Sequence, residues 1–327
     1  MSADAPIVWL ASFPKSGNTW MRAIITAARG GDRLFAVDKL SSGSQPHLVG
    51  GANRAFGLDP RWLTVSELRT LRDSLVALPH DRPAAEGPTI SETKDVITLP
   101  ESALAASPTD AGPGEPAAPS VGRPATDSLV FRKTHEVYRY GALGAQPFPN
   151  RVTRAAILIV RDPRAVACSW APFFGVSLDQ AVARIGREQP DKASPARAQT
   201  EQPWGTWSDH ANSWLSAGVP FPVHMVRYED LQADAMATLL PVFAAVGWSI
   251  SQDELAVALK RTAFDRLKTD EQEQGFRESS AKTQAFFRSG QAAKWRSELT
   301  ESQVQQVEMQ HSEMMQRLGY EPVVARS

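Results

Sequence analysis

Three short apolar runs, each followed by a polar break and a helix-like stretch, constrain the fold of this chain more than any other feature. The runs begin at Ile7, Ala156 and Val223 and have the composition of buried strands. After the first break, apolar residues recur at helical spacing until Gly30, and after the second, Pro163 suits the first turn of a helix. Strands that alternate with helices indicate a parallel sheet covered on both faces. We therefore predict an α/β fold with a central parallel sheet flanked by helices.

The size and composition of the chain favour one globular domain, which we place at residues 1–327. Its 327 residues are 42% hydrophobic, enough for a sizeable core. The formal net charge of −1 gives no basic field for nucleic acid, and the sequence shows no signal peptide or membrane-spanning apolar run. Cys168 is the only cysteine, which rules out an intramolecular disulfide and a cysteine-based metal site. We expect a cytoplasmic protein without a nucleic-acid or membrane partner.

Two polar stretches that contain prolines are expected to be surface loops. Residues 100–126 are mostly Ala, Pro, Gly, Ser and Thr, a composition that predicts a mobile loop. Residues 187–203 form either a plain solvated loop or a lid over a site, and the sequence leaves both readings open.

The break after the first run has the features of an anion-binding loop. A strand that leads through a glycine-containing loop into a helix directs backbone N–H groups at one point, where the helix dipole also favours negative charge. Four side chains add donors there: Lys15, Ser16, Asn18 and Thr19. Lys15 precedes Gly17, so the loop is P-loop-like without matching the nucleoside-triphosphate motif G-x-x-x-x-G-K-[ST]. We therefore predict an anion site of a different kind.

Two motifs carry a resemblance to the cytosolic-type sulfotransferase family. The residues from Phe13 to Trp20, FPKSGNTW, resemble that family's 5′-phosphosulfate loop, T-Y-P-K-S-G-T-T-W, with Asn18 in place of a threonine. The stretch RDPRAVACS, residues 161–169, resembles the family's 3′-phosphate motif, in which an arginine and a serine eight positions further on hold the nucleotide. Each of these two motifs is fairly specific.

Three weaker motifs follow in the order in which the family has them. FRKTH, residues 131–135, resembles the K-T-H element that carries the family's catalytic histidine. RTAF, residues 261–264, resembles the T-x-F segment beside the adenine. FRSG, residues 287–290, with Trp295 behind it, resembles the R-K-G-x-x-G-x-W element, with Ser289 in place of the lysine. The shared order makes the chain similar to the family over most of its length.

The resemblance implies an enzyme that moves the sulfuryl group of 3′-phosphoadenosine 5′-phosphosulfate (PAPS) to a hydroxyl or amine of a small-molecule acceptor and releases 3′-phosphoadenosine 5′-phosphate (PAP). His135 would be the general base of an in-line displacement, since an imidazole is largely neutral at cellular pH. Lys15 would neutralise the departing oxygen, and Lys133 would hold the substrate or the sulfuryl oxygens. Taken alone, a lysine in a turn is usually solvated and a single histidine is usually structural, so these roles depend on the resemblance.

The resemblance also implies which residues bind the nucleotide. Those expected at the 5′-phosphosulfate are Lys15, Ser16, Gly17, Asn18 and Thr19. Those expected at the adenine are Trp20, Tyr228, Thr262 and Phe264. Those expected at the 3′-phosphate are Arg161, Ser169, Arg288, Ser289 and Gly290. Because Ser289 replaces the family's lysine, one cationic contact to the 3′-phosphate would be missing.

The sequence says less about the acceptor, metals and assembly. Several aromatic residues follow the motifs, and we expect most of them in the core and some beside the acceptor: Trp170, Phe173, Phe174, Trp204 and Trp207. The acceptor could be a phenol, an alcohol, a sugar, a lipid or a natural product. No carboxylate, histidine or cysteine cluster has the spacing of metal ligands, so we predict no metal. The family's dimer element, K-x-x-x-T-V-x-x-x-E, is poorly matched at residues 296–305, which leaves the oligomeric state open.

Two other classes of function stay open at this point. A nucleotide-dependent kinase or NTPase shares the strand-loop-helix anion site, but it needs a lysine after the glycine and a carboxylate for Mg²⁺. A nucleotide-binding module without catalysis would keep the motifs and lack the transfer reaction. Binding of PAP, compared with ATP and Mg²⁺, distinguishes the first class, and transfer that depends on His135 distinguishes the second.

Overall fold

Strands and helices alternate along the chain, as the apolar runs predict. The computed structural model describes residues 6–30, 59, 62–68, 129–138, 148–188, 202–276, 278, 285–288 and 290–323; the predicted loop at 100–126 lies outside these residues, as does most of 187–203. The strands are β1 (Ile7–Ser12), β2 (Val130–Thr134), β3 (Thr153–Val160) and β4 (Val223–Arg227). The helices are α1 (Asn18–Gly30), α4 (Pro163–Phe174), α5 (Leu178–Ile185), α6 (Trp207–Trp214), α7 (Tyr228–Ala233), α8 (Ala235–Ala245), α9 (Gln252–Arg261), α10 (Phe264–Gln274), α11 (Trp295–Glu298) and α12 (Glu301–Arg317).

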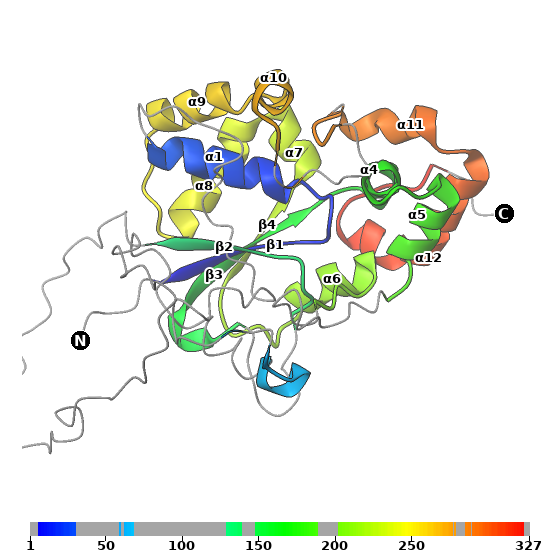
Figure 1. Ribbon diagram of the computed structural model, residues 1–327, viewed down its shortest axis with the longest axis horizontal. Coiled ribbons are helices and arrows are strands. Elements are labelled where there is room, and N and C mark those ends of the chain that lie inside the picture. Colours follow the sequence, from blue (N-terminus) through cyan, green and yellow to red (C-terminus); the bar gives the residue numbers. More distant parts are fainter. Residues whose placement is uncertain are drawn as a thin grey trace, which may run out of the picture. The chain divides into compact units, whose positions relative to one another are not determined.

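The four strands form one parallel sheet in the order β2-β1-β3-β4. β1 lies inside the sheet, where Ala11 is paired with Thr134 of β2 on one side and with Leu158 of β3 on the other. Figure 1 shows helices packed against both faces of this sheet. The prediction of an α/β fold with a central parallel sheet is confirmed.

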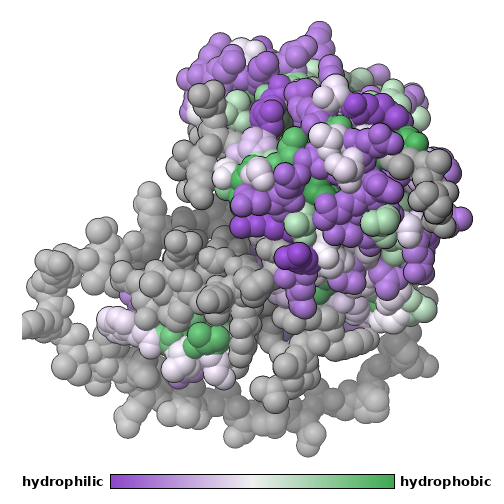
Figure 2. All heavy atoms as spheres, turned by 90° about the vertical axis from the view of Figure 1, so that its right-hand side faces the viewer, coloured by the Kyte–Doolittle hydropathy of each residue, from purple (hydrophilic) through white to green (hydrophobic). Residues whose placement is uncertain are grey.

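Side chains that alternate along the strands divide the core into two layers. In β1, Trp9 belongs to a cluster with residues of α4, α5, α6 and α12, whereas Leu10 belongs to a cluster with residues of α1, α8 and α9. Both side chains are fully buried. Hydrophilic side chains dominate the described part of the face in Figure 2, where apolar ones occur only in small groups. Among the helices described, none has both the length and the apolar character needed to cross a bilayer.

Local sequence determines where α4 begins. Pro163 occupies the first turn, and the carboxylate of Asp162 accepts from the backbone N of Arg164 at 2.9 Å. The guanidinium of Arg164 also donates to Glu308 of α12 at 2.6 Å and lies 4.0 Å from the ring centroid of Trp295 in α11. One buried cation therefore ties α4 to α11 and α12.

The carboxyl ends of all four strands lie at the same edge of the sheet, because the strands are parallel. β1 leads directly into the loop at 13–17, β2 into His135, β3 into Arg161 and β4 into Tyr228. Residues that are far apart in the sequence therefore meet there.

Candidate active site

A cavity of about 400 Å³ lies at the carboxyl edge of the sheet. Most residues predicted from the sequence line it: Lys15, Gly17, Asn18, Thr19, Trp20, Lys133, His135, Arg161, Ser169, Tyr228, Phe264, Arg288 and Gly290. Ser16 and Thr262 are buried outside its wall, and Ser289 falls outside the described residues. The structure thus brings residues of five separate sequence motifs around one space.

The loop after β1 makes a tight turn that requires unusual backbone angles. Lys15 has φ = 72°, a left-handed conformation that is uncommon for residues other than glycine, and Gly17 has φ = 105°. A Cβ atom on Gly17 would lie 2.6 Å from Cδ2 of Tyr228. Only glycine can therefore occupy this position while the loop packs against Tyr228.

The ammonium group of Lys15 lies between two aromatic rings. Its Nζ is 3.9 Å from the ring centroid of Phe173 and 4.0 Å from that of Phe286, both within cation–π range. Burial, followed by the neighbouring charges of Arg161 and Lys133, lowers the pKa of Lys15 to about 7. A positive charge is therefore costly at this position, although the carboxylates of Glu278 and Glu271 act in the opposite sense.

A carboxylate that the sequence did not predict, Glu278, forms an ionic cluster in the wall of the cavity. It pairs with Arg22 and with Lys133, whose Nζ is 3.4 Å from Oε2, and the hydroxyl of Thr19 donates to it at 3.2 Å. Burial acts in the opposite sense, but the charges of Lys133 and Arg22 hold the pKa of Glu278 below its ordinary value. The carboxylate is therefore charged and bound by three donors.

His135 is oriented by the end of the neighbouring strand. Its Nδ1 lies 2.7 Å from the carbonyl oxygen of Ser12 and 3.2 Å from the Ser12 hydroxyl. Because a carbonyl oxygen only accepts, Nδ1 carries the hydrogen in the neutral ring. The lone pair is therefore on Nε2, the atom that can take a proton from another group.

Asn18 supports this arrangement from the start of α1. Its Nδ2 donates to the carbonyl oxygen of Leu10 at 2.8 Å and to the hydroxyl of Ser12 at 3.1 Å. Both N–H bonds of the amide are thus used within the protein, which leaves Oδ1, an acceptor, for other contacts. Asn18 lines the predicted 5′ cradle, and its donors hold the strand end that orients His135.

Arg161 and Tyr228 connect the ends of β3 and β4. The guanidinium of Arg161 lies 4.4 Å from the ring centroid of Tyr228 and donates to the carbonyl oxygen of Lys15 at 3.3 Å. The hydroxyl of Tyr228 donates to the carbonyl oxygen of Gly290 at 2.9 Å. The predicted 3′-phosphate residues are therefore linked to the loop after β1 by direct contacts.

Phe264 and Trp20 enclose a second part of the cavity. A Cβ atom on Gly290, which has φ = 62°, would lie 2.5 Å from Cδ2 of Phe264, so the backbone at 290 passes close to this ring. Nε1 of Trp20 donates to the carbonyl oxygen of Thr262 at 3.0 Å. The hydroxyl of Thr262 donates to Ala258 within α9 at 2.8 Å. Thr262 thus positions Trp20 from behind, and its hydroxyl is turned into the helix.

Aromatic side chains form the wall beside His135 and Lys15, and the members that line the cavity are Phe173, Phe174, Trp204, Phe286 and Phe287. Trp170 and Trp207 are buried in the core instead.

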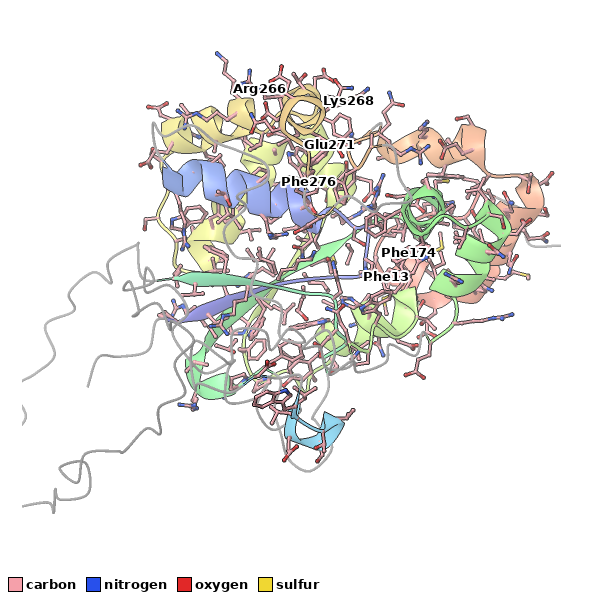
Figure 3. All side chains as sticks on the ribbon, viewed as in Figure 1. Phe13, Phe174, Arg266, Lys268, Glu271 and Phe276 are labelled. Atoms are coloured by element: carbon pink, nitrogen blue, oxygen red, sulfur yellow. The ribbon has the colours of Figure 1, made fainter. Side chains whose placement is uncertain are left out.

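Glu271 of α10 accepts from the backbone N–H groups of Phe286 and Phe287 at 2.6 and 2.8 Å. Figure 3 shows Glu271 directed inward from α10, whereas Arg266 and Lys268 of the same helix point outward. Glu271 therefore anchors the segment that carries one of the two rings around Lys15.

Sequence reasoning missed the charged groups that only tertiary structure brings to the site. Glu278 follows α10 in a polar stretch that matches no motif. Lys294 and Glu298 also line the cavity and form an ion pair at 2.7 Å; a basic residue next to the motif residue Trp295 was the available signal. Within the described ranges, no set of three or more His, Cys, Asp or Glu side chains is arranged to hold a metal ion.

Known proteins with related sequences are sulfotransferases. A sequence model described as "Sulfotransferase domain" matches residues 5–319. Rat Sulfotransferase 2A6 is 26% identical over 172 residues, 51% of this chain and 57% of the relative. Guinea pig (Cavia porcellus) 3-alpha-hydroxysteroid sulfotransferase is 27% identical over 122 residues, 36% of this chain and 42% of the relative. The chain thus spans about half the length of the curated relatives it matches.

Solved structures share the fold at low sequence identity. Mouse sulfotransferase SULT7A1 complexed with PAP has a TM-score of 0.54 and 16% identity, and the match covers 96% of this chain and 87% of that chain. Retinol dehydratase in complex with retinol and PAP has a TM-score of 0.52 and 15% identity, with coverage of 100% and 85%. At these identities the likeness concerns the fold, whereas the match to residues 5–319 establishes the family. The chain belongs to the sulfotransferase domain family.

Proposed function

We propose that the protein is a PAPS-dependent sulfotransferase that transfers a sulfuryl group to a hydroxyl or amine of a small-molecule acceptor. Membership of the family supports this function, and so does the presence of PAP in structures of the same fold. The observation that carries the proposal is the convergence of Lys15, Lys133 and His135 on one cavity. Two lysines that can be protonated beside a bound anion, and an imidazole with its lone pair on Nε2, meet the needs of this reaction.

In the proposed reaction, the acceptor oxygen attacks sulfur from the side opposite the bridging oxygen. An O–S bond forms while the bridging S–O bond breaks, and the acceptor's proton passes to Nε2 of His135. The departing electron pair stays on the 5′-phosphate oxygen of PAP, where Lys15 stabilises the charge, while Lys133 holds the sulfuryl oxygens. Positioning and charge stabilisation provide most of the rate, by analogy with phosphoryl transfer.

The two ends of the nucleotide are assigned to different parts of the cavity. Arg161, Arg288 and Ser169 bind the 3′-phosphate, since the guanidinium fork suits two-point contact with phosphate. Trp20 and Phe264 enclose the adenine, which presents a flat face for aromatic stacking.

The aromatic wall favours an acceptor with an apolar body. Phe174, Trp204 and Phe286 line the cavity with His135, so an apolar group can bind beside the general base. Retinol dehydratase, which shares the fold, has been solved with retinol and with androsterone. The acceptor proposed here is therefore a small apolar molecule with one reactive hydroxyl or amine.

A single domain over residues 1–327 and a cytoplasmic location stay predictions.

Nucleotide binding gives the first test. PAP should raise the melting temperature of the protein, whereas ATP with Mg²⁺ at the same concentration should raise it much less. The opposite order would favour the kinase or NTPase reading and contradict the proposed function.

Transfer from labelled PAPS to a panel of phenols, alcohols and amines gives the second test. His135→Ala should bind PAP with the affinity of the unmodified protein and lose transfer by about a hundredfold or more. His224→Ala, at a half-buried histidine of β4 outside the cavity wall, is the matched control and should keep its rate. Full activity of His135→Ala would contradict the assignment of His135 as the general base. If the unmodified protein transferred sulfuryl to none of the acceptors, a nucleotide-binding module without catalysis would be favoured.

A further inference from the structure

The ionic cluster of Arg22, Lys133, Thr19 and Glu278 is not explained by the proposed reaction. Arg22 lies in α1, and its side chain is only 3% exposed, against 9% for Lys133 and 26% for Glu278. Nε of Arg22 has no hydrogen-bond partner within the described part of the chain. A buried guanidinium requires a nearby anion, and Glu278 supplies the ion pair that the structure shows.

The place of the Glu278 carboxylate coincides with the anion site of the proposed function. Two of its three donors, Thr19 and Lys133, are residues assigned to the phosphosulfate, and both line the cavity. Thr19 lies in the first turn of α1, where the helix dipole favours a negative charge. The same donors cannot fully serve a carboxylate and a phosphosulfate at the same time, and two anions this close repel each other in a buried site.

We propose that the carboxylate of Glu278 occupies the anion site of the unliganded protein, that the 5′ anionic group of the nucleotide displaces it, and that Arg22 then becomes a further ligand of that group. This inference rests on the proposed function, because it takes the ligand to be a nucleotide with a 5′-phosphate or phosphosulfate. Arg22 must keep an anionic partner when Glu278 leaves, since an isolated buried charge is unfavourable. Glu278 therefore sets the affinity for the nucleotide, and Arg22 adds to it.

The exchange predicts opposite effects for the two members of the ion pair. Glu278→Gln removes the competing charge and keeps the shape of the side chain, so PAP should bind about tenfold more tightly. Arg22→Met removes a ligand of the incoming anion, so PAP should bind about tenfold more weakly. If Glu278 were a fixed support for Lys133, Glu278→Gln would weaken binding or leave it unchanged.

The experiment is calorimetric titration of the full chain with PAP and, by competition, with adenosine 3′-phosphate, which lacks the 5′ anion. Glu278→Gln should tighten PAP binding and leave adenosine 3′-phosphate unchanged. Glu273→Gln, at an exposed carboxylate of α10, makes the same change of net charge and should alter neither affinity. A crystal structure of the unmodified protein with PAP should show Glu278 separated from Arg22, a readout that does not depend on the folding of a variant.

The outcomes distinguish a failure of this exchange from a failure of the proposed function. If the unmodified protein does not bind PAP, the proposed function and the exchange fail together. If PAP binds while Glu278→Gln has unchanged or weaker affinity, or if Glu278 stays paired with Arg22 in the PAP complex, the function stands and the exchange is overturned.

Discussion

Nucleotide binding should add a proton to Lys15. Burial and the charges of Arg161 and Lys133 lower the pKa of this lysine to about 7 in the unliganded protein. A phosphate placed against the ammonium group reverses the balance, because an opposite charge favours the protonated form. The protonation state of Lys15 therefore depends on whether the anion site is filled.

The size of the effect follows from the titration. With a pKa of about 7, Lys15 carries roughly 0.1 proton at pH 8, and a lysine paired with phosphate stays protonated, so binding should take up about 0.9 proton. The affinity for PAP should accordingly fall by up to about tenfold per pH unit above pH 7. The direction of this pH dependence follows from the lowered pKa of Lys15. Above pH 7 Lys15 lacks the proton and must gain it when PAP binds, whereas below pH 7 it already holds the proton.

Calorimetry in buffers of different ionisation enthalpy measures this uptake directly. At pH 8 the secondary ionisation of phosphate groups is complete and contributes little. Lys15→Met keeps an apolar chain between Phe173 and Phe286 and should abolish the uptake. Tight PAP binding without proton uptake by the unmodified protein would refute the reasoning, and so would equal uptake by Lys15→Met.

Three further perturbations test other contacts. Gly290→Ala should weaken PAP binding roughly tenfold, since its Cβ atom would meet the ring of Phe264, whereas Gly275→Ala, also at positive φ but with nothing within 4 Å, should not; equal effects would contradict the clash. Asn18→Ala should lower kcat about tenfold and change the PAP Kd little, because the amide holds the strand end that orients His135, the proposed general base. A loss confined to Kd would refute this. Arg164→Met should lower the free energy of unfolding by about 3–5 kcal/mol in urea denaturation, because two buried carboxylates lose their cation; a change below about 1 kcal/mol would contradict it.

The strands and helix ends could be predicted because each has a signal in its own stretch of sequence. The runs at Ile7, Ala156 and Val223 became β1, β3 and β4, and Gly30 and Pro163 mark a helix end and a helix start. The strand order β2-β1-β3-β4 has no such signal, since it depends on which crossovers place each strand beside its neighbours.

The residues around the cavity were predictable where they lie next to strand ends. Lys15, His135 and Arg161 follow β1, β2 and β3 directly, and parallel strands bring their carboxyl ends to one edge. Glu278 was missed because its role comes from partners in α1 and β2 that are distant in the sequence. Thr262 was expected at the adenine; it is buried outside the cavity wall, and its hydroxyl donates to the carbonyl oxygen of Ala258 in α9, a partner that motif spacing does not predict.

The position of His135, the proposed general base, depends on strand register through its hydrogen bond with the carbonyl oxygen of Ser12. Ala11 pairs with Thr134, so Ser12 and His135, the residues that follow them in the sequence, lie side by side and their carbonyl and imidazole groups meet. That register is held by the buried alternation of Trp9 and Leu10, whereas the aromatic wall is carried by α4 and by the segments around 204 and 286. If the proposed roles hold, exchanging the aromatic wall should change the acceptor preference while His135 keeps its place at the end of β2.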